Sequence, residues 1–304
     1  MMRKKRIWLL GLAILLLVLL GIGIFEPSGI ILGYFKGEKT FKGRPTTYWR
    51  RALGGTDPAV QNQALQSLEK GGADALPVLI ELIQIQDQRD WEAGEVRRTA
   101  AELVGRLGPQ GQSAVPALVA SLKDPDRHFR AAVASALGQV GGQDPLACGA
   151  LVDLLKTESR LSALRALSRI GPAGPTAIPD LIDLLHDADS EIRWNAALNL
   201  GKMGPEARGA VPDLIKSLKD PDADVREHSA ESLGQIGQDA QSVVPALIEA
   251  LSDKSPRVRR DAARSLGQLG AAAWSAIPAL EKLKKDESDR VREAADKSIH
   301  QISP

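Results

Sequence analysis

Apolar residues recur along most of the chain at the spacing of short amphipathic helices. In PDLIKSL, residues 212–218, the apolar positions are Leu214, Ile215 and Leu218, and the segment VREHSAESLGQI at 225–236 again places apolar residues three and four apart. Such residues lie on one face of a helix, whereas a half-buried strand needs strict alternation of apolar and polar residues. These segments lack that alternation. The pattern therefore predicts pairs of short helices, each with one buried face.

The predicted helix pairs recur with a period of about 33 residues, which lies in the range of known repeat architectures. An arginine stands near the start of each second helix, and successive arginines follow one another at this interval with a single shorter step. A glycine that closes each second helix keeps the same phase and shares the one short step. A period of this length indicates stacked repeats, because a single helix pair cannot bury its apolar face alone. The arginines are Arg97, Arg130, Arg160, Arg193, Arg226, Arg259 and Arg292, and the short step is the one that ends at Arg160.

The segment between Thr46 and Gly72 fits the same pattern as a degenerate first unit, in which Gln61 takes the place of the arginine. Terminal repeats are expected to be atypical because they cap the stack. The sequence therefore predicts an all-α fold, an α-solenoid of about eight helix pairs over residues 45–304.

Proline, aspartate and arginine also recur in several of the units as P-x7-D-x5-R, for example Pro212, Asp220 and Arg226. This pattern resembles the HEAT repeat, in particular the short HEAT-like type found in phycobilisome lyases. The resemblance implies first helices on the convex side, second helices on the concave side, and a hydrogen-bonded ladder of Asp and Arg through the stack. Carried over to this chain, the ladder consists of Asp124, Asp187, Asp220, Asp253 and Asp286 with the seven arginines named above.

The remaining apolar pattern is the uncharged run from Ile7 to Phe25. At 1.5 Å per residue it would span about 28 Å, close to the thickness of a hydrocarbon core. A cleaved signal peptide would have a shorter apolar stretch and a small-residue cleavage site, and a buried helix of a soluble domain is a third interpretation. The four basic residues before the run favour a cytoplasmic N-terminus. The predicted organisation is a basic cytoplasmic tail (1–6), a transmembrane anchor (7–25), a linker (26–44) and a repeat solenoid (45–304) outside the cytoplasm.

Composition and charge narrow the classes of function. The chain has 39 basic and 38 acidic residues, and the concave arginines alternate with Asp and Glu. A basic stripe is the footprint of a nucleic-acid-binding protein, so no nucleic-acid partner is expected. The single cysteine, Cys148, excludes an intrachain disulfide and a site with several cysteine ligands. We expect no cofactor.

The stretch SLKDPD occurs twice, at 121–126 and 217–222, and raises the question of a calcium site. Counted from Asp220, an EF-hand loop would end at Glu231, but Val225 stands where that loop needs glycine, and the next residue is an arginine. The stretch is interpreted instead as the joint between two helices. The four histidines lack the spacing of a metal motif, so no metal is expected; they are His128, His186, His228 and His300.

Partner binding is the function that these patterns favour. The residues that follow each ladder arginine are expected to be exposed on the concave face, and Trp194 is the strongest anchor because Trp and Arg are enriched in binding hot spots; a tryptophan folded against its neighbours is the alternative. We predict a non-enzymatic, membrane-anchored scaffold for a protein partner. The resemblance implies a different alternative, a bilin lyase-like enzyme or pigment-handling factor, and a spacer without a partner is a third. The candidate partner-binding residues are Arg98, Trp194, Asn195, Glu227, His228, Arg260, Asp261 and Arg264.

Overall fold

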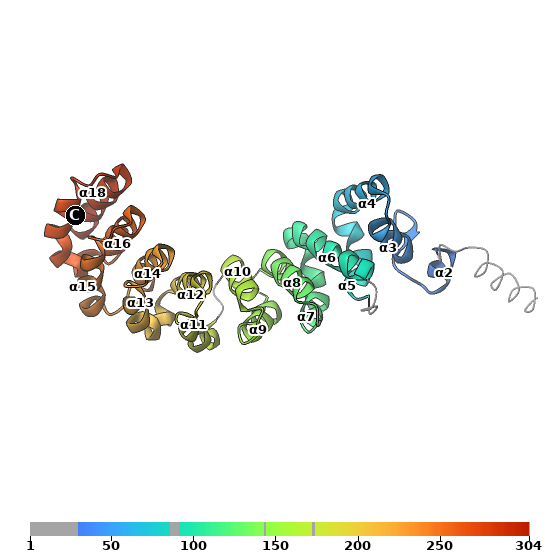
Figure 1. Ribbon diagram of the computed structural model, residues 1–304, viewed down its shortest axis with the longest axis horizontal. Coiled ribbons are helices and arrows are strands. Elements are labelled where there is room, and N and C mark those ends of the chain that lie inside the picture. Colours follow the sequence, from blue (N-terminus) through green and yellow to red (C-terminus); the bar gives the residue numbers. More distant parts are fainter. Residues whose placement is uncertain (1–29, 86–90, 143, 172–173, 304) are drawn as a thin grey trace, which may run out of the picture. The chain divides into compact units, whose positions relative to one another are not determined.

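The computed structural model describes residues 30–85, 91–142, 144–171 and 174–303 of the 304-residue chain. They divide into two compact units, unit 1 up to Ala136 and unit 2 from Leu137 (Figure 1). The boundary falls within a helix, directly before the short repeat that breaks the regular period. Each unit is built from stacked helix pairs.

Sixteen helices in the described residues form eight successive pairs, which confirms the predicted repeat architecture. The first helices of the pairs are α3 (Thr46–Gly54), α5 (Leu76–Ile83), α7 (Val115–Ser121), α9 (Pro145–Leu154), α11 (Ile178–Leu184), α13 (Val211–Ser217), α15 (Ala240–Ala250) and α17 (Ile277–Leu283). The second helices are α4 (Pro58–Gly71), α6 (Trp91–Arg106), α8 (Arg127–Val140), α10 (Arg160–Ile170), α12 (Ser190–Lys202), α14 (Ala223–Ile236), α16 (Pro256–Gln268) and α18 (Asp289–Ile302).

Local residue chemistry sets where these helices begin and end. Pro212 is the second residue of α13, where its missing N–H costs little. The side chain of Asp222 caps α14 by accepting the backbone N–H groups of Asp224 and Val225. Gly237 ends α14 with a φ of 63°, a left-handed conformation that glycine adopts without strain. Short 3₁₀ helices precede five of the first helices: η1 (Gly72–Ala75), η2 (Gly108–Ala114), η3 (Pro175–Ala177), η4 (Gly204–Ala210) and η5 (Gly270–Ala276).

The segment before the first repeat, predicted as a linker (26–44), forms short regular elements in the residues that the structure describes. Its described part contains α2 (Ile30–Phe35) and an antiparallel ribbon of β1 (Thr40–Phe41) and β2 (Arg44–Pro45), with Phe41 opposite Arg44. Phe41 is buried, and its ring centroid lies 5.4 Å from that of Trp49 in α3. The carboxylate of Glu38 accepts the Thr47 backbone N–H at 2.7 Å. Burial of one aromatic side chain thus attaches this segment to the first helix pair.

The predicted tail (1–6) and anchor (7–25) lie outside the described residues. Among the helices that the structure describes, none combines the length and the hydropathy needed to cross a bilayer.

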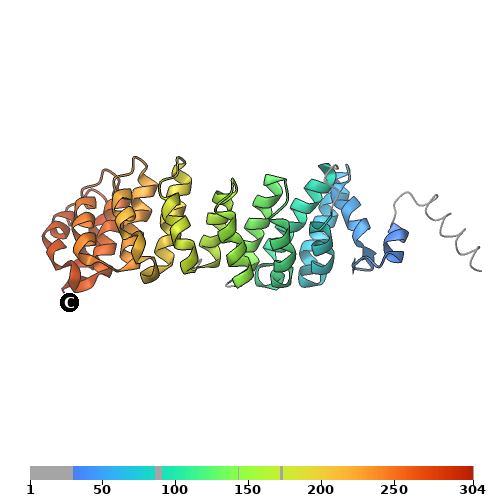
Figure 2. The same ribbon diagram turned by 90° about the horizontal axis from the view of Figure 1, so that it is seen from below.

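Within unit 2, the second helices α10, α12, α14, α16 and α18 follow one another in one row, and the first helices form a second row (Figures 1 and 2). Figure 1 shows the second helices along the inner side of the curve of unit 2. The core lies between the two rows, where Leu214 of α13 and Leu233 of α14 are fully buried. The exposed side of the second-helix row is called the inner face below.

The later second helices of unit 2 approach one another closely at a glycine in α12, α14 and α16. A Cβ atom built on Gly234 of α14 would lie 2.5 Å from Ser265 Oγ and 2.6 Å from Ser265 Cβ of α16. Ser265 Oγ in turn donates to the backbone carbonyl of Ala230 at 2.8 Å. Gly201 and Ser232 repeat this contact one unit earlier. Small residues therefore set the spacing of the second-helix row.

Candidate functional site

The arginine–aspartate ladder ties successive helix pairs together at five junctions in the described residues. Arg226 donates through Nε and Nη2 to the carboxylate of Asp253, at 2.7 and 3.0 Å. Its Nη1 donates to the backbone carbonyl of Asp220 in its own repeat at 2.7 Å. Each such arginine therefore ties two successive repeats together. The equivalent interrepeat pairs are Arg97–Asp124 in unit 1, and Arg160–Asp187, Arg193–Asp220 and Arg259–Asp286 in unit 2.

The other two ladder arginines make the same contact within their own repeat as Arg226 does. Arg130 Nη1 donates to the Asp124 carbonyl at 2.7 Å, and Arg292 Nη1 donates to the Asp286 carbonyl at 2.6 Å. Thr157 follows Arg130 at the sequence separation where the other repeats carry the aspartate. The Thr157 hydroxyl accepts the Ser159 backbone N–H at 3.1 Å, as the aspartates accept the N–H two residues on. Sequence analysis missed Thr157, which the constant separation of the ladder partners would have found.

The repeated SLKDPD stretch has a structural role in both copies. Asp220 binds Arg193 of the preceding repeat, and its Oδ1 also accepts the Asp222 backbone N–H at 2.9 Å. Asp222 is the N-cap of α14. These two carboxylates are therefore engaged by protein groups. In the described residues, no group of three or more His, Cys, Asp or Glu side chains is arranged to hold a metal ion.

Trp194 and His228 form an aromatic pair on the inner face. They lie on the neighbouring helices α12 and α14, and their rings stack with centroids 5.0 Å apart and an interplanar angle of 27°. Both side chains are half-buried. His228 Nδ1 also lies 3.4 Å from Glu231 Oε2, and this hydrogen bond lowers the pKa of Glu231. The tryptophan thus packs against a neighbour and still presents part of its ring to solvent.

Next to this pair, a network of ion pairs joins α14 to α16. Arg260 Nη2 lies 3.1 Å from Glu227 Oε1 and 2.6 Å from Asp261 Oδ2. Arg257 Nη1 lies 2.9 Å from Glu227 Oε2. Burial nevertheless raises the pKa of Glu227, because desolvation of its carboxylate outweighs the attraction of the two arginines. The network places alternating charges beside the aromatic pair.

The expectation of exposure is wrong for three of the candidate residues. Asn195, Glu227 and Asp261 are only 2, 8 and 6% exposed. Asn195 turns back to donate to the Glu191 backbone carbonyl. Arg257 and Arg260 of the next helix pair with Glu227, whereas Asp261 pairs with Arg260 of its own helix. Partners in the same helix or in the next one therefore hold these polar side chains away from solvent.

The other candidates retain exposed surface. Arg98 of α6, in unit 1, is half-buried and pairs with Glu95. Arg260 is half-buried within the network of ion pairs. Arg264 is exposed and has one distant partner, Asp261 Oδ1 at 3.5 Å. The structure thus brings Trp194, His228, Arg260 and Arg264 onto the inner face of unit 2.

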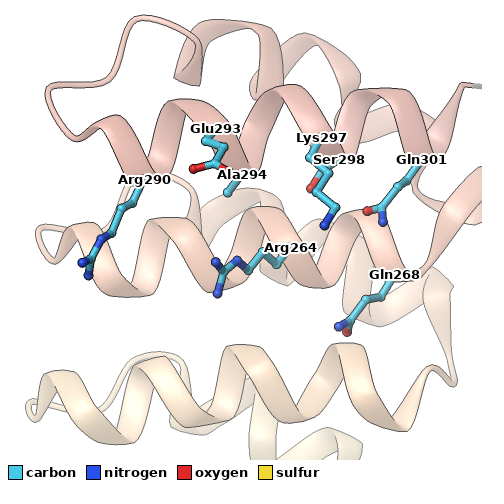
Figure 3. A pocket seen from close by; sticks show the side chains of 8 residues that line it. All are labelled: Arg264, Gln268, Arg290, Glu293, Ala294, Lys297, Ser298 and Gln301. Atoms are coloured by element: carbon cyan, nitrogen blue, oxygen red, sulfur yellow. The ribbon is translucent and has the colours of Figure 1, made fainter.

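A hollow of about 220 Å³ lies farther along the inner face, between α16 and α18 (Figure 3). Arg264 and Gln268 line it from one helix, and Arg290, Glu293 and Lys297 line it from the next. Sequence analysis named only Arg264 of these residues. The repeat period could have found two others, since Arg290 follows Arg257 and Lys297 follows Arg264 by one repeat.

Cys148 does not have the surroundings of a reactive cysteine. It lies in α9 and is half-buried. Burial and the neighbouring Asp144 raise the pKa of its thiol. A raised pKa disfavours the thiolate, which is the nucleophilic form. The thiol therefore packs as a small, weakly polar group.

Comparison with solved structures gives engineered helical proteins. One crystal structure, a Northeast Structural Genomics Consortium target, has a TM-score of 0.56 and 23% identity over 85% of this chain and 78% of that chain. A second engineered protein from the same consortium has a TM-score of 0.41 and 21% identity over 84% of this chain and 96% of that chain. The first likeness concerns the fold alone. Comparison with curated proteins gives no match.

The family model of HEAT repeats matches residues 88–161, 157–210 and 211–299. These matches cover well over half of the chain and agree with the helix pairs and the arginine–aspartate pairs of the structure. The chain therefore belongs to the HEAT-repeat family.

Proposed function

We propose that this protein is a membrane-anchored scaffold that binds a protein partner on the inner face of unit 2. The observation that carries the proposal is the stacked pair of Trp194 and His228, which is half-exposed on adjacent second helices. Interface hot spots are enriched in tryptophan and arginine and are surrounded by energetically near-neutral contacts that exclude water. The ion-pair network of Glu227 and Arg260 would provide such surrounding contacts.

The inner face is also suited to an extended partner segment. Five consecutive second helices contribute to it, and each repeat presents the same few positions. Such a surface offers many separate contacts along a line, as expected for repeat proteins. Ion pairs between exposed side chains would fix the register of the segment more than its affinity.

The membrane anchor is the second part of the proposal. It is supported by the apolar run from Ile7 to Phe25 and by the exposed apolar side chains of α2, which begins shortly after it; these are Ile31, Leu32, Tyr34 and Phe35. The positive residues before the run place the N-terminus in the cytoplasm and the repeats outside it. Protease added to the non-cytoplasmic side should digest the repeat domain, and digestion only from the cytoplasmic side would contradict this topology.

The partner site is tested by recovering proteins crosslinked to the full-length chain in its membrane. We expect Trp194→Ala to reduce recovery of the specific partner more than about tenfold, because loss of a hot-spot residue costs about 2 kcal/mol or more. Trp274→Ala is the matched control, since Trp274 is 63% exposed and lies on η5, between α16 and α17, rather than on a second helix. Equal recovery with both variants would refute binding at the Trp194–His228 pair.

The bilin lyase-like alternative stays a prediction from the resemblance. Co-expression of the chain with a phycobilin and its acceptor protein tests it directly. Covalent chromophore attachment that depends on this chain would replace the scaffold proposal with an enzymatic one.

A further inference from the structure

The hollow between α16 and α18 has an excess of positive charge. Three cationic side chains and one carboxylate line it: Arg264, Arg290, Lys297 and Glu293. Within the described part of the chain, Arg290 and Lys297 form no ion pair or side-chain hydrogen bond, and Arg264 has only the 3.5 Å approach to Asp261. Asp261 is itself held by Arg260 at 2.6 Å. The local positive charge is therefore largely uncompensated.

The repeat of α14 carries the opposite charge at the corresponding positions. Asp224 stands one repeat before Arg257 and two before Arg290, and Glu231 has the same relation to Arg264 and Lys297. Both carboxylates have a partner: Asp224 lies 2.5 Å from Arg257, and Glu231 lies 3.4 Å from the imidazole of His228. The inner face thus changes from paired acidic positions on α14 to unpaired basic positions on α18.

Neutral hydrogen-bond donors complete the hollow. The side-chain amides of Gln268 and Gln301 lie along the same edge as Lys297, one on each helix (Figure 3). Amide N–H groups and cations together suit carboxylate oxygens, which accept several hydrogen bonds. The small volume, about 220 Å³, fits side-chain carboxylates better than a folded surface.

We propose that this hollow binds the carboxylates of an acidic segment in the protein partner. The inference rests on the proposed function and specifies the chemistry of the segment that follows the apolar anchor at Trp194. Carboxylates fit better than phosphate groups, because Glu293 within the hollow repels a dianion more strongly than it repels a single negative charge. The cations also come from three separate side chains and can contact successive acidic residues of one extended segment.

The test measures binding of a fluorescent peptide of alternating Glu and Gly to the full-length chain in detergent, by fluorescence anisotropy. The same peptide with Gln in place of Glu is the ligand control, and a phosphoserine peptide and inorganic phosphate are the competing anions. Arg264→Gln, Arg290→Gln and Lys297→Gln are combined in one variant. Lys254→Gln, Lys282→Gln and Lys285→Gln are combined in a charge-matched control, since these exposed lysines lie outside the hollow.

We expect the triple variant of the hollow to weaken Glu-peptide binding about 30-fold, because each exposed charge contact contributes about threefold. The control variant should bind nearly as well as the wild type, and added salt should weaken binding to the wild type. Glu293→Gln should tighten binding about threefold by removing the one carboxylate. All the altered side chains are exposed, so the circular dichroism spectrum and melting temperature should not change.

Several outcomes would overturn the inference. They are equal binding of the Gln peptide, equal losses in both triple variants, and binding of the phosphoserine peptide or phosphate alone. Each can occur while partner recovery still depends on Trp194, which would leave the scaffold proposal intact. Conversely, binding of the Glu peptide at the hollow with no dependence of partner recovery on Trp194 would refute the anchor and keep the acidic site.

Discussion

Arg226 and Arg160 occupy the same position in their repeats but differ in burial. The side chain of Arg226 is 5% exposed and forms two hydrogen bonds to Asp253, whereas Arg160 is 37% exposed and forms one bond to Asp187. Removing one partner of a buried pair leaves the other charge without water or a counter-ion, which is costly. An exposed pair contributes much less because water replaces the lost partner.

We therefore predict that Arg226→Met destabilises the protein by about 3 kcal/mol. Arg160→Met is the matched variant and should cost about 1 kcal/mol or less. The measurement is the free energy of unfolding of the full chain, from urea denaturation followed by circular dichroism. Equal losses for the two variants would show that burial does not set the strength of the ladder.

At the residue scale, the sequence predicts the ladder better than the exposed face. Ladder partners keep a constant separation in the sequence. The repeat period therefore predicts which arginine and aspartate are neighbours in space, as for Arg193 and Asp220. The exposure of the residues that follow each ladder arginine cannot be predicted from the repeat period in this way. Asp261 and His228 both follow a ladder arginine by two positions, yet one is buried and the other half-exposed. The side chains that pack beside this position, such as Arg260 beside Asp261 and Trp194 beside His228, differ from repeat to repeat.

At the scale of the helix, close packing of the second-helix row depends on a glycine and a serine. Gly201, Gly234 and Gly267 each leave room for a serine of the next second helix. A methyl group added to Gly234 would meet Ser265 Cβ at 2.6 Å, and this atom cannot move without shifting its helix. Overpacking of this kind forces backbone displacement in a dense interior.

Gly234→Ala is accordingly expected to destabilise the protein by about 2 kcal/mol, although alanine is the better helix former. The control is Gly149→Ala in α9, where an added Cβ meets no atom within 4 Å. That substitution should stabilise the protein by about 0.5–1 kcal/mol, because it removes backbone entropy from the unfolded chain. Thermal melting of both variants measures whether each substitution raises or lowers the stability of the protein. A loss of stability in both would contradict the packing argument.

At the scale of the whole chain, the constant repeat period is what made the fold predictable. It specifies the helix pairs and their order because each repeat buries its apolar face against the next. The N-terminal segment lies outside the period, so the burial of Phe41 against Trp49 had no signal of its own. The sequence shows that the unit with Thr157 is shorter than the others. It does not predict that this unit lies beside the boundary of the two compact units, which only the structure shows.

The ladder also predicts how the stability of the protein depends on acid. The hydrogen bond from Arg259, with further support from the Ser288 N–H, holds the pKa of Asp286 below its ordinary value. Burial opposes ionisation of Asp253, but its bonds from Arg226 and from the Ser255 N–H outweigh that effect and lower its pKa as well. A carboxyl group whose pKa is lower in the folded state stabilises that state at any pH above its unfolded value of about 3.9. This stabilisation is lost as the pH falls through the folded pKa, because the folded state must then take up a proton.

The free energy of unfolding should therefore change little between about pH 5.5 and 7 on account of these groups and should fall below about pH 4. Asp286→Asn removes one of the carboxylates and leaves Arg259, which is 10% exposed, without its main partner. This variant should lose about 3 kcal/mol at pH 7. Its stability should then fall less steeply than that of the wild type from about pH 4 to about pH 2.5, because it has one fewer group to protonate. Urea denaturation at a series of pH values measures both slopes, and parallel curves for the two proteins would mean that the Arg259–Asp286 pair does not contribute to acid sensitivity.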